Sequence, residues 1–184
     1  MAVIHRAELQ PTKRELLAAW LPQQPWGAAL DAVLGAYRLD DPDGEVGIEV
    51  HIVRGVDGVV RQVPATYRAA PLTGAALIGT TLHSVLGQRW VHDGCTDPVA
   101  VAALATTIRS GGAGAEEWVE QETGPPVRRQ ASAEVRGVPP VDDSDGELVV
   151  RRVLDETAPA DGAAGVLLAT WNGQEQPVVV AHLT

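Results

Sequence analysis

The chain has 184 residues, of which 45% are hydrophobic and 21% charged, and its formal net charge is −10. This composition is typical of a globular protein and excludes a disordered chain, whose polarity would prevent core formation. It also argues against nucleic acid as a partner, because phosphate binding needs extended clusters of Lys and Arg. The only basic doublets are Lys13-Arg14, Arg128-Arg129 and Arg151-Arg152.

The sequence carries no signal for export or membrane insertion. Cys95 is the only cysteine, so an internal disulfide is excluded and nothing requires an oxidising compartment. The first ten residues lack the apolar core of a signal peptide, and no apolar run is long enough to span a bilayer. We therefore expect a cytoplasmic protein without membrane contact.

The first predicted element is a helix over about residues 12–21. Thr12 and Glu15 have the spacing of a capping box, in which each side chain satisfies a backbone amide at the start of the helix. An apolar stripe at helical spacing follows, and Pro22 cannot continue the helix. The stripe consists of Leu16, Leu17, Trp20 and Leu21.

A meander of three strands is predicted next. Hydrophobic residues then alternate with a period of two from Val33 to Leu39, from Val46 to Ile52 and from Val59 to Tyr67. The segments between them, 41–44 and 57–58, carry the Asp, Pro and Gly residues of tight turns. One or two further strands are predicted over residues 75–91.

A second helix is predicted over about residues 98–110, with Asp97 as its cap and Pro98 at its first position. Its expected buried stripe is Val101, Leu104 and Ile108. Residues 111–146 are rich in Gly, Pro and acids, and we expect the highest mobility there. Within them we predict a short helical piece around 116–122 and a weak strand around 131–138.

The last third is predicted to be rich in strands, at 148–154, 166–171 and 177–183, with Asn172-Gly173 as a hairpin turn. The expected fold class is α+β. A curved antiparallel sheet would pack on the N-terminal helix over residues 1–92. The second helix, the mobile loop and the C-terminal strands would form a smaller part over residues 93–184.

Polar residues of the predicted meander are the main candidates for a binding surface. Val46, Ile48, Val50 and Ile52 would face the core, so Glu49 and His51 would face outward or into a groove. Thr81, His83 and Arg89 could join the same concave face if the next strand belongs to that sheet. The simpler interpretation is an ordinary exposed polar face.

Other motifs have simple structural explanations. The segments 41–45 and 143–147 resemble the start of a calcium loop but fit ordinary turns better, because the remaining ligands are missing. No phosphate-binding loop surrounds residues 111–114, and Ser84 beside His83 lacks a nucleophile elbow. A loose group of potential zinc ligands matches the spacing of no closed site. It consists of His83, His92, Asp93, Cys95 and Asp97.

Several stretches, in order, are similar to the N-terminal cap region of the maltokinases, from about residue 2 to residue 110. They are Ala2–Leu9, Thr12–Leu17, Trp20–Trp26, Gly35–Arg38, Asp41-Pro42, Glu45–Glu49, Val63–Arg68, Leu77–Gly87 and Trp90–Pro98. The resemblance implies an α+β cap with a curved antiparallel sheet and a helix. In the full-length family this cap precedes a lobe that phosphorylates maltose with ATP, in metabolism linking trehalose to α-glucans.

The chain differs from full-length maltokinases in lacking recognisable catalytic parts. Phosphoryl transfer needs a phosphate cradle, a metal-holding Asp and a positioning base, and we expect the chain to end before a catalytic lobe. We therefore expect a non-catalytic cap-like module without cofactor or metal. It would bind a protein partner or a sugar-type ligand, and could assemble with itself.

Two alternatives remain open from the sequence. The chain could be a small enzyme or metal-binding protein that uses His83, His92, Asp93 and Cys95. It could also be a structural subunit of a kinase-like complex. Elemental analysis for zinc discriminates the first alternative from a binding module.

Overall fold

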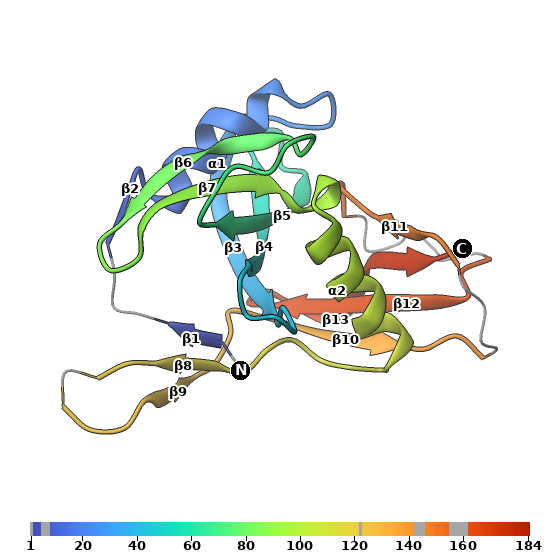
Figure 1. Cartoon of the computed structure of the whole chain (residues 1–184). Coiled ribbons are helices and arrows are strands. Elements are labelled where there is room, and N and C mark those ends of the chain that lie inside the picture. Colours follow the sequence, from blue (N-terminus) through green and yellow to red (C-terminus); the bar gives the residue numbers. More distant parts are fainter. Residues whose placement is uncertain (1, 5–7, 122, 142–145, 155–161) are drawn as a thin grey trace.

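The fold is described from a computed structural model that covers residues 2–4, 8–121, 123–141, 146–154 and 162–184. These residues form mostly antiparallel strands, arranged as a curled half-barrel sheet and two smaller sheets, with two short α-helices (Figure 1). The fold is therefore α+β, as expected. Within the described ranges, no helix is long and apolar enough to cross a bilayer.

The first helix, α1 (Lys13–Trp20), begins at the predicted capping box. The Thr12 hydroxyl accepts from the Glu15 amide at 3.3 Å, and the Glu15 carboxylate accepts from the Thr12 amide at 2.7 Å. A single 3₁₀ turn (Leu21–Gln23) continues the helix. Leu16, Leu17 and Trp20 are buried against Val53, Val63 and Val91 of the largest sheet, so α1 covers one face of it.

The largest sheet contains the predicted meander, and its strand order is β2-β6-β7-β5-β4-β3. All its pairs are antiparallel. The segment 75–91 forms two strands. The strands are β2 (Leu9–Gln10), β3 (Leu30–Leu39), β4 (Gly47–Gly55), β5 (Val60–Arg68), β6 (Leu77–His83) and β7 (Gly87–Asp93).

Both faces of β4, which lies between β5 and the edge strand β3, are buried, and here the expectation of a free polar face is wrong. Glu49 is only 5% exposed and His51 only 3%. Their face lies toward α1, while Ile48, Val50 and Ile52 face the main core. Successive side chains of β4 therefore point alternately to two faces that are both buried.

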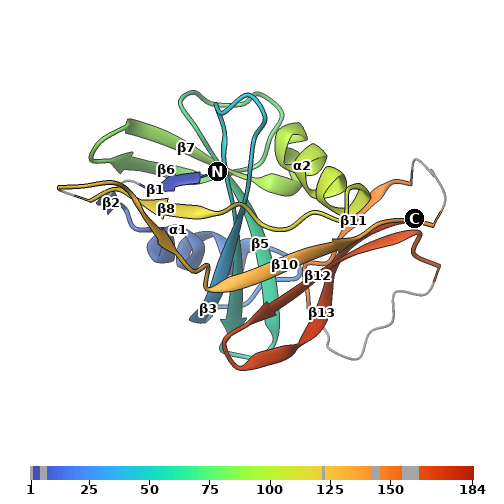
Figure 2. The same ribbon diagram turned by 90° about the horizontal axis from the view of Figure 1, so that it is seen from below.

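The main core lies between the largest sheet, a four-stranded sheet and the second helix, α2 (Pro98–Arg109). The four-stranded sheet has the order β10-β12-β13-β11, and Figure 2, a view from below, shows β10 running across the direction of β3 of the largest sheet. The C-terminal strands thus form a sheet of their own. They are β10 (Ala133–Val138), β11 (Leu148–Val150), β12 (Gly165–Trp171) and β13 (Gln174–Leu183).

Helix α2 is anchored at both ends. The Asp97 carboxylate accepts from the Val99 amide at 3.0 Å, as predicted for the cap. Near its end α2 passes so close to β10 that a Cβ atom on Gly137 would lie 2.0 Å from the Thr107 carbonyl oxygen, which only glycine allows. The fully buried stripe includes Ala100, Leu104 and Ile108, whereas Val101 is only half-buried.

The two larger sheets are joined by the segment after β11. Arg61 of β5 pairs with Val153, and the buried Gln62 side chain donates to the carbonyl oxygens of Arg151 and Val180. The Arg152 guanidinium bonds the Asp93 carboxylate. The expected segments 1–92 and 93–184 therefore share contacts and a core, while a domain boundary at residue 92 stays a prediction.

A third, three-stranded sheet, here called the leaf, consists of β1 (Ala2–Ile4), β8 (Glu117–Val119) and β9 (Val127–Arg129). Figure 1 shows it beside the two larger sheets. The predicted helix around 116–122 is wrong, because Glu117–Val119 pairs in parallel with Ala2–Ile4. The expected strand near 131–138 is confirmed as β10. The mobility expected for 111–146 stays a prediction.

The first of the two Asp-Gly segments, residues 41–45, is a turn. This is the interpretation that the sequence favoured over a calcium loop. The Asp41 carboxylate accepts from the amides of Asp43, Glu45 and Val46 at 3.2, 2.9 and 2.8 Å. Gly44 takes a positive φ of 71° there. The second segment, with Asp143 and Asp145, lies outside the described residues.

Candidate functional site

The five predicted binding residues lie in two separate groups. Glu49 and His51 lie together on β4, whereas Thr81, His83 and Arg89 lie on the β6–β7 hairpin. The Thr81 hydroxyl is buried and donates to the Pro11 carbonyl oxygen at 2.7 Å. This hydrogen bond gives Thr81 a structural role, because it holds the segment that precedes α1.

The other two hairpin residues hold the turn between β6 and β7. His83 Nδ1 accepts from the amides of Val85 and Leu86 at 3.2 and 3.1 Å. Arg89 Nη2 donates to the Leu86 carbonyl oxygen at 2.8 Å. Both side chains therefore stabilise the turn, and a ligand-binding role for them stays a prediction.

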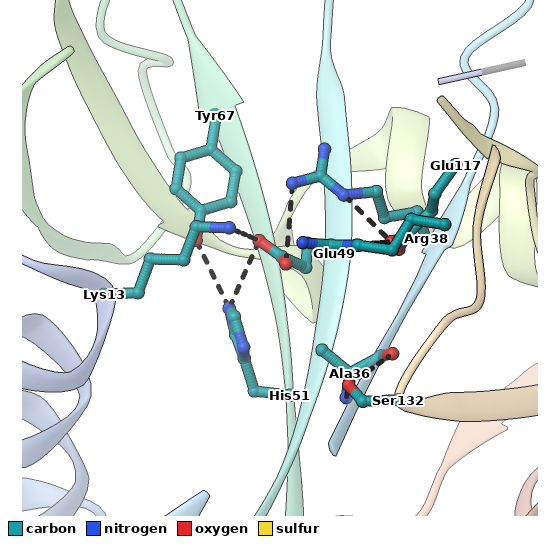
Figure 3. A network of polar contacts seen from close by, with 9 residues as sticks. Lys13, Ala36, Arg38, Glu49, His51, Tyr67, Glu117 and Ser132 are labelled. Atoms are coloured by element: carbon teal, nitrogen blue, oxygen red, sulfur yellow. Dashed lines mark hydrogen bonds and ion pairs between the residues drawn. The ribbon is translucent and has the colours of Figure 1, made fainter. Parts of the chain in front are cut away.

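A buried charge cluster surrounds Glu49 (Figure 3). The Glu49 carboxylate bonds the Lys13 ammonium of α1 and lies 3.5 Å from Arg38 Nη2 of β3. His51 Nε2 lies 3.7 Å from the same carboxylate and 3.2 Å from the Tyr67 hydroxyl. The Lys13 ammonium also lies 5.6 Å from the centre of the Tyr67 ring. Helix α1 and three strands thus meet at one carboxylate.

The cluster continues into the leaf through Glu117, which is 3% exposed. Its carboxylate accepts from Arg129 Nε and Nη2 at 2.8 and 2.6 Å, and lies 3.7 Å from Arg38 Nε. Arg38 therefore stands between two buried carboxylates, one on the main sheet and one on the leaf. Three cations, Lys13, Arg38 and Arg129, face two carboxylates, which leaves one excess positive charge.

The buried groups have shifted pKa values. Burial alone would raise the pKa of Glu49, but the attraction of His51 in its protonated form and of the Arg38 and Lys13 cations outweighs it and brings the pKa to about 2. Burial lowers the pKa of His51 more than Glu49 raises it. Burial and the nearby Glu49 raise the pKa of Tyr67 well above its usual value. At neutral pH, Tyr67 therefore keeps its proton and His51 is uncharged.

A hollow of about 880 Å³ opens beside the cluster, between the leaf and the start of β10. We call it the arginine hollow, because four guanidinium groups and three carboxylates line it together with uncharged residues. Its charged residues are Arg38, Arg128, Arg129, Arg136, Glu116, Glu117 and Glu134. Arg38 and Glu117 belong both to the buried cluster and to the wall of this hollow.

A second hollow of about 600 Å³ lies along α2 and shares residues 113–116 with the arginine hollow. We call it the acidic trough, because Asp40, Asp41, Asp43 and Glu116 line it and no Lys or Arg is among the described lining residues. Its remaining wall is mostly apolar and small. Val99, Ala102, Ala103 and Thr106 of α2 form one side.

Residues of the loose group of potential zinc ligands make hydrogen bonds to backbone amides and ion pairs. Asp97 caps α2 and also accepts from Thr66 and Arg68, both at 2.7 Å. His92 Nε2 accepts from the Leu72 amide at 3.2 Å. Burial raises the pKa of the Cys95 thiol to about 12, which makes it a poor nucleophile at neutral pH. In the part of the chain that the structure describes, no three His, Cys, Asp or Glu residues gather as a metal site would require.

Ser84 and His83 do not form a catalytic pair. The Ser84 hydroxyl accepts from the Glu8 amide at 3.0 Å, and His83 Nδ1 is occupied by two backbone amides. A nucleophilic serine would need a histidine nitrogen within hydrogen-bond reach as its base. The contacts of both side chains are those of a stabilised hairpin turn.

Five residues of the cluster were not predicted from the sequence, namely Lys13, Arg38, Tyr67, Glu117 and Arg129. One signal for Lys13 was available, because the sole lysine of the chain lies on the predicted first helix. Arg38 could have been found from strand pairing, since it is the direct cross-strand partner of Glu49. For Glu117 no signal was available, because its segment reads as a helix.

Residues 20–97 match the family model of the maltokinase N-terminal cap domain. The resemblance that the sequence motifs indicated is thereby confirmed over this segment, which comprises α1 from its last residue, five strands of the largest sheet and the cap of α2. Glu49, His51 and Arg38 lie inside the matched segment, whereas the leaf and the four-stranded sheet lie outside it. No curated protein matches the chain.

Proposed function

We propose that this chain is a non-catalytic binding module built on a maltokinase-type cap, and that its ligand occupies the arginine hollow. The observation that carries this proposal is the continuity between the buried charge cluster and the hollow. Arg38 contacts both Glu49 and Glu117, so the cap segment and the leaf hold one wall of the hollow in a fixed position. Such preorganised polar groups are typical of ligand sites.

The chemistry of the lining favours a polyhydroxylated, sugar-type ligand. Guanidinium groups offer only hydrogen-bond donors and carboxylates offer only acceptors, so together they can satisfy hydroxyl groups, which both donate and accept. The charges in the hollow nearly balance, with four Arg and three Glu side chains. A neutral sugar or a sugar with one negative charge would fit this balance better than a cation.

A role in maltose, trehalose or α-glucan metabolism is part of the proposal, and it rests on the family description alone. The absence of catalysis is likewise proposed. It is supported by the hydrogen bonds of Ser84 and His83 to backbone groups and by the raised pKa of Cys95. We also propose that the protein acts in the cytoplasm, because its single cysteine needs no oxidising compartment.

A thermal-shift panel tests the ligand class. The purified chain is heated with maltose, trehalose, maltose 1-phosphate, glycogen fragments or ATP with magnesium. At a concentration about 100 times its Kd, a ligand adds about 2.7 kcal/mol to stability, which corresponds to roughly 5–10 °C for a chain of this size. We expect such a shift with at least one sugar; no shift with any sugar would contradict the proposal.

Two matched variants distinguish the arginine hollow from the sheet face that the sequence suggested. Arg136→Ala removes an exposed guanidinium from the wall of the hollow, and Arg89→Ala removes one from the β6–β7 hairpin. We expect the sugar-induced shift to fall with Arg136→Ala and to persist with Arg89→Ala. The reverse result would return the site to the hairpin.

A further inference from the structure

Helix α2 has an unusual surface for a helix at the edge of a core. Its residues 98–108 include no charged side chain. One stripe, with Ala100, Leu104 and Ile108, is buried in the main core. A surface helix normally carries charged or polar residues on the opposite face, but here that face is again apolar and small. It lies along the acidic trough.

The trough has a defined shape. Val99, Ala102, Ala103 and Thr106 form its α2 side, and the turn after β3 and residues 112–116 form the rest. The turn is rigid, because the Asp41 carboxylate accepts from three backbone amides. The small side chains of α2 leave room for the side chains of an incoming segment, in a volume of about 600 Å³.

The charge of the trough selects its occupant. Asp40, Asp41 and Asp43 of the turn after β3 line it together with Glu116, whose carboxylate lies 3.2 Å from Arg128 Nη2, and the described lining residues include no Lys or Arg. The arginine hollow, by contrast, has four Arg side chains against three Glu. An apolar floor with an acidic rim is complementary to an apolar segment flanked by positive charges.

We propose that the acidic trough is the docking site for a basic amphipathic segment of a protein partner. Apolar side chains of that segment pack on the alanine side of α2, and its Arg or Lys side chains lie at the rim. A second copy of this chain is a poor occupant, because each copy carries a net charge of −10 and the two would repel each other. This interface shares residues 113–116 with the arginine hollow, but it does not depend on a sugar ligand.

The test is a binding measurement with a fluorescent synthetic peptide. The peptide is an amphipathic helix with alanine and leucine on one face and arginines at both ends; a second peptide has glutamates in place of the arginines. We expect the full chain to bind the arginine peptide and not the glutamate peptide. Absence of binding to the arginine peptide, or equal binding of both, would overturn the proposal.

Two matched variants locate the contact. Ala102→Arg places a bulky cation on the exposed α2 side of the trough, and Ala18→Arg makes the same change on the exposed face of α1. We expect Ala102→Arg to weaken the binding of the arginine peptide at least about tenfold and Ala18→Arg to leave it unchanged. Equal affinities for the two variants would overturn the proposal.

Charge and self-association provide two further tests. The variant Asp43→Asn removes rim charge from the trough alone, and we expect weaker binding of the arginine peptide, with an affinity that also depends less on salt. Light scattering of the wild-type chain without peptide should give a monomer. A dimer that Ala102→Arg abolishes would show that a second copy occupies the trough, and would overturn the proposal of a basic partner.

Discussion

The arginine hollow and the acidic trough share one short wall segment, residues 113–116, yet their charges differ. Four Arg side chains line the arginine hollow, whereas the charged residues of the trough are Asp40, Asp41, Asp43 and the shared Glu116. In a chain with a net charge of −10, positive charge at one place needs a local cause. The cause is the buried cluster, where Glu49 and Glu117 hold Arg38 and Arg129 at the wall of the hollow.

Outside the shared residues 113–116, the two hollows are built from different side chains and can be altered separately. The arginine hollow depends on ion pairs that link the leaf to the main sheet. The acidic trough depends on the apolar side of α2 and on a turn closed by Asp41. Changes to the cluster should therefore affect sugar binding, whereas changes to α2 should affect peptide binding.

The largest effect is expected for Glu49→Ala. The substitution leaves Lys13 and Arg38 without their shared carboxylate in a buried place. Removing one partner of a buried ion pair costs about 3–5 kcal/mol. Urea unfolding of both proteins measures the loss. As a control, Glu175→Ala, at an exposed position of β13, should change stability by less than about 0.5 kcal/mol; similar values for the two variants would contradict the role of the cluster.

A smaller and more local effect is expected for Glu117→Gln, which weakens the link between the leaf and the sheet. Loss of a charged hydrogen-bond acceptor to Arg129 should cost about 1–3 kcal/mol. Amide hydrogen exchange should become faster in β8 and β9 but not in β12. The variant should lose sugar binding and keep binding of the arginine peptide; loss of both would show that the two hollows are not independent.

Acidification should destabilise the protein through His51 and Glu49. The pKa of His51 is lowered in the folded state, so below the usual value of 6.5 the unfolded chain takes up its proton first and stability falls. The Glu49 pKa of about 2 gives stability above about 4.5 that is lost as the pH falls toward 2. Urea unfolding at several pH values measures both. His51→Gln should flatten the decline between about pH 7 and pH 5; an unchanged slope would contradict the assignment.

The smallest effect concerns salt. The wild-type affinity for the arginine peptide should fall when ionic strength rises from about 0.01 to about 0.15 M, because exposed charges become screened. The affinity for a neutral sugar in the arginine hollow should remain nearly constant over the same range. Titrations of both probes at the two ionic strengths measure this difference. A clear salt dependence of the affinity for the neutral sugar would contradict this expectation.

Local sequence signals predicted much of the fold. Thr12 and Glu15 marked the start of α1, and Asp97 with Pro98 marked the start of α2, because capping depends on residues within one turn. The meander followed from a period of two and from Asp-Gly turns. These features need no knowledge of distant segments.

Features that depend on distant pairing were not predicted. The sequence pattern places Glu49 and His51 on an exposed face. The alternation of hydrophobic and polar residues cannot reveal that α1 covers that face and brings Lys13 to it. The segment around Glu117 reads as helical, but it pairs with β1, more than a hundred residues earlier in the chain. The arginine hollow was missed for the same reason, since its walls come from the leaf, β3 and β10.

The most direct test of the account is an amide NMR titration of the isotope-labelled chain with the sugar that gives the largest thermal shift. We expect chemical-shift changes at residues 113–117, 128–136 and Arg38, which line the arginine hollow, and none along β6 and β7. Changes confined to Thr81, His83 and Arg89 would contradict the account and assign ligand binding to the β6–β7 hairpin.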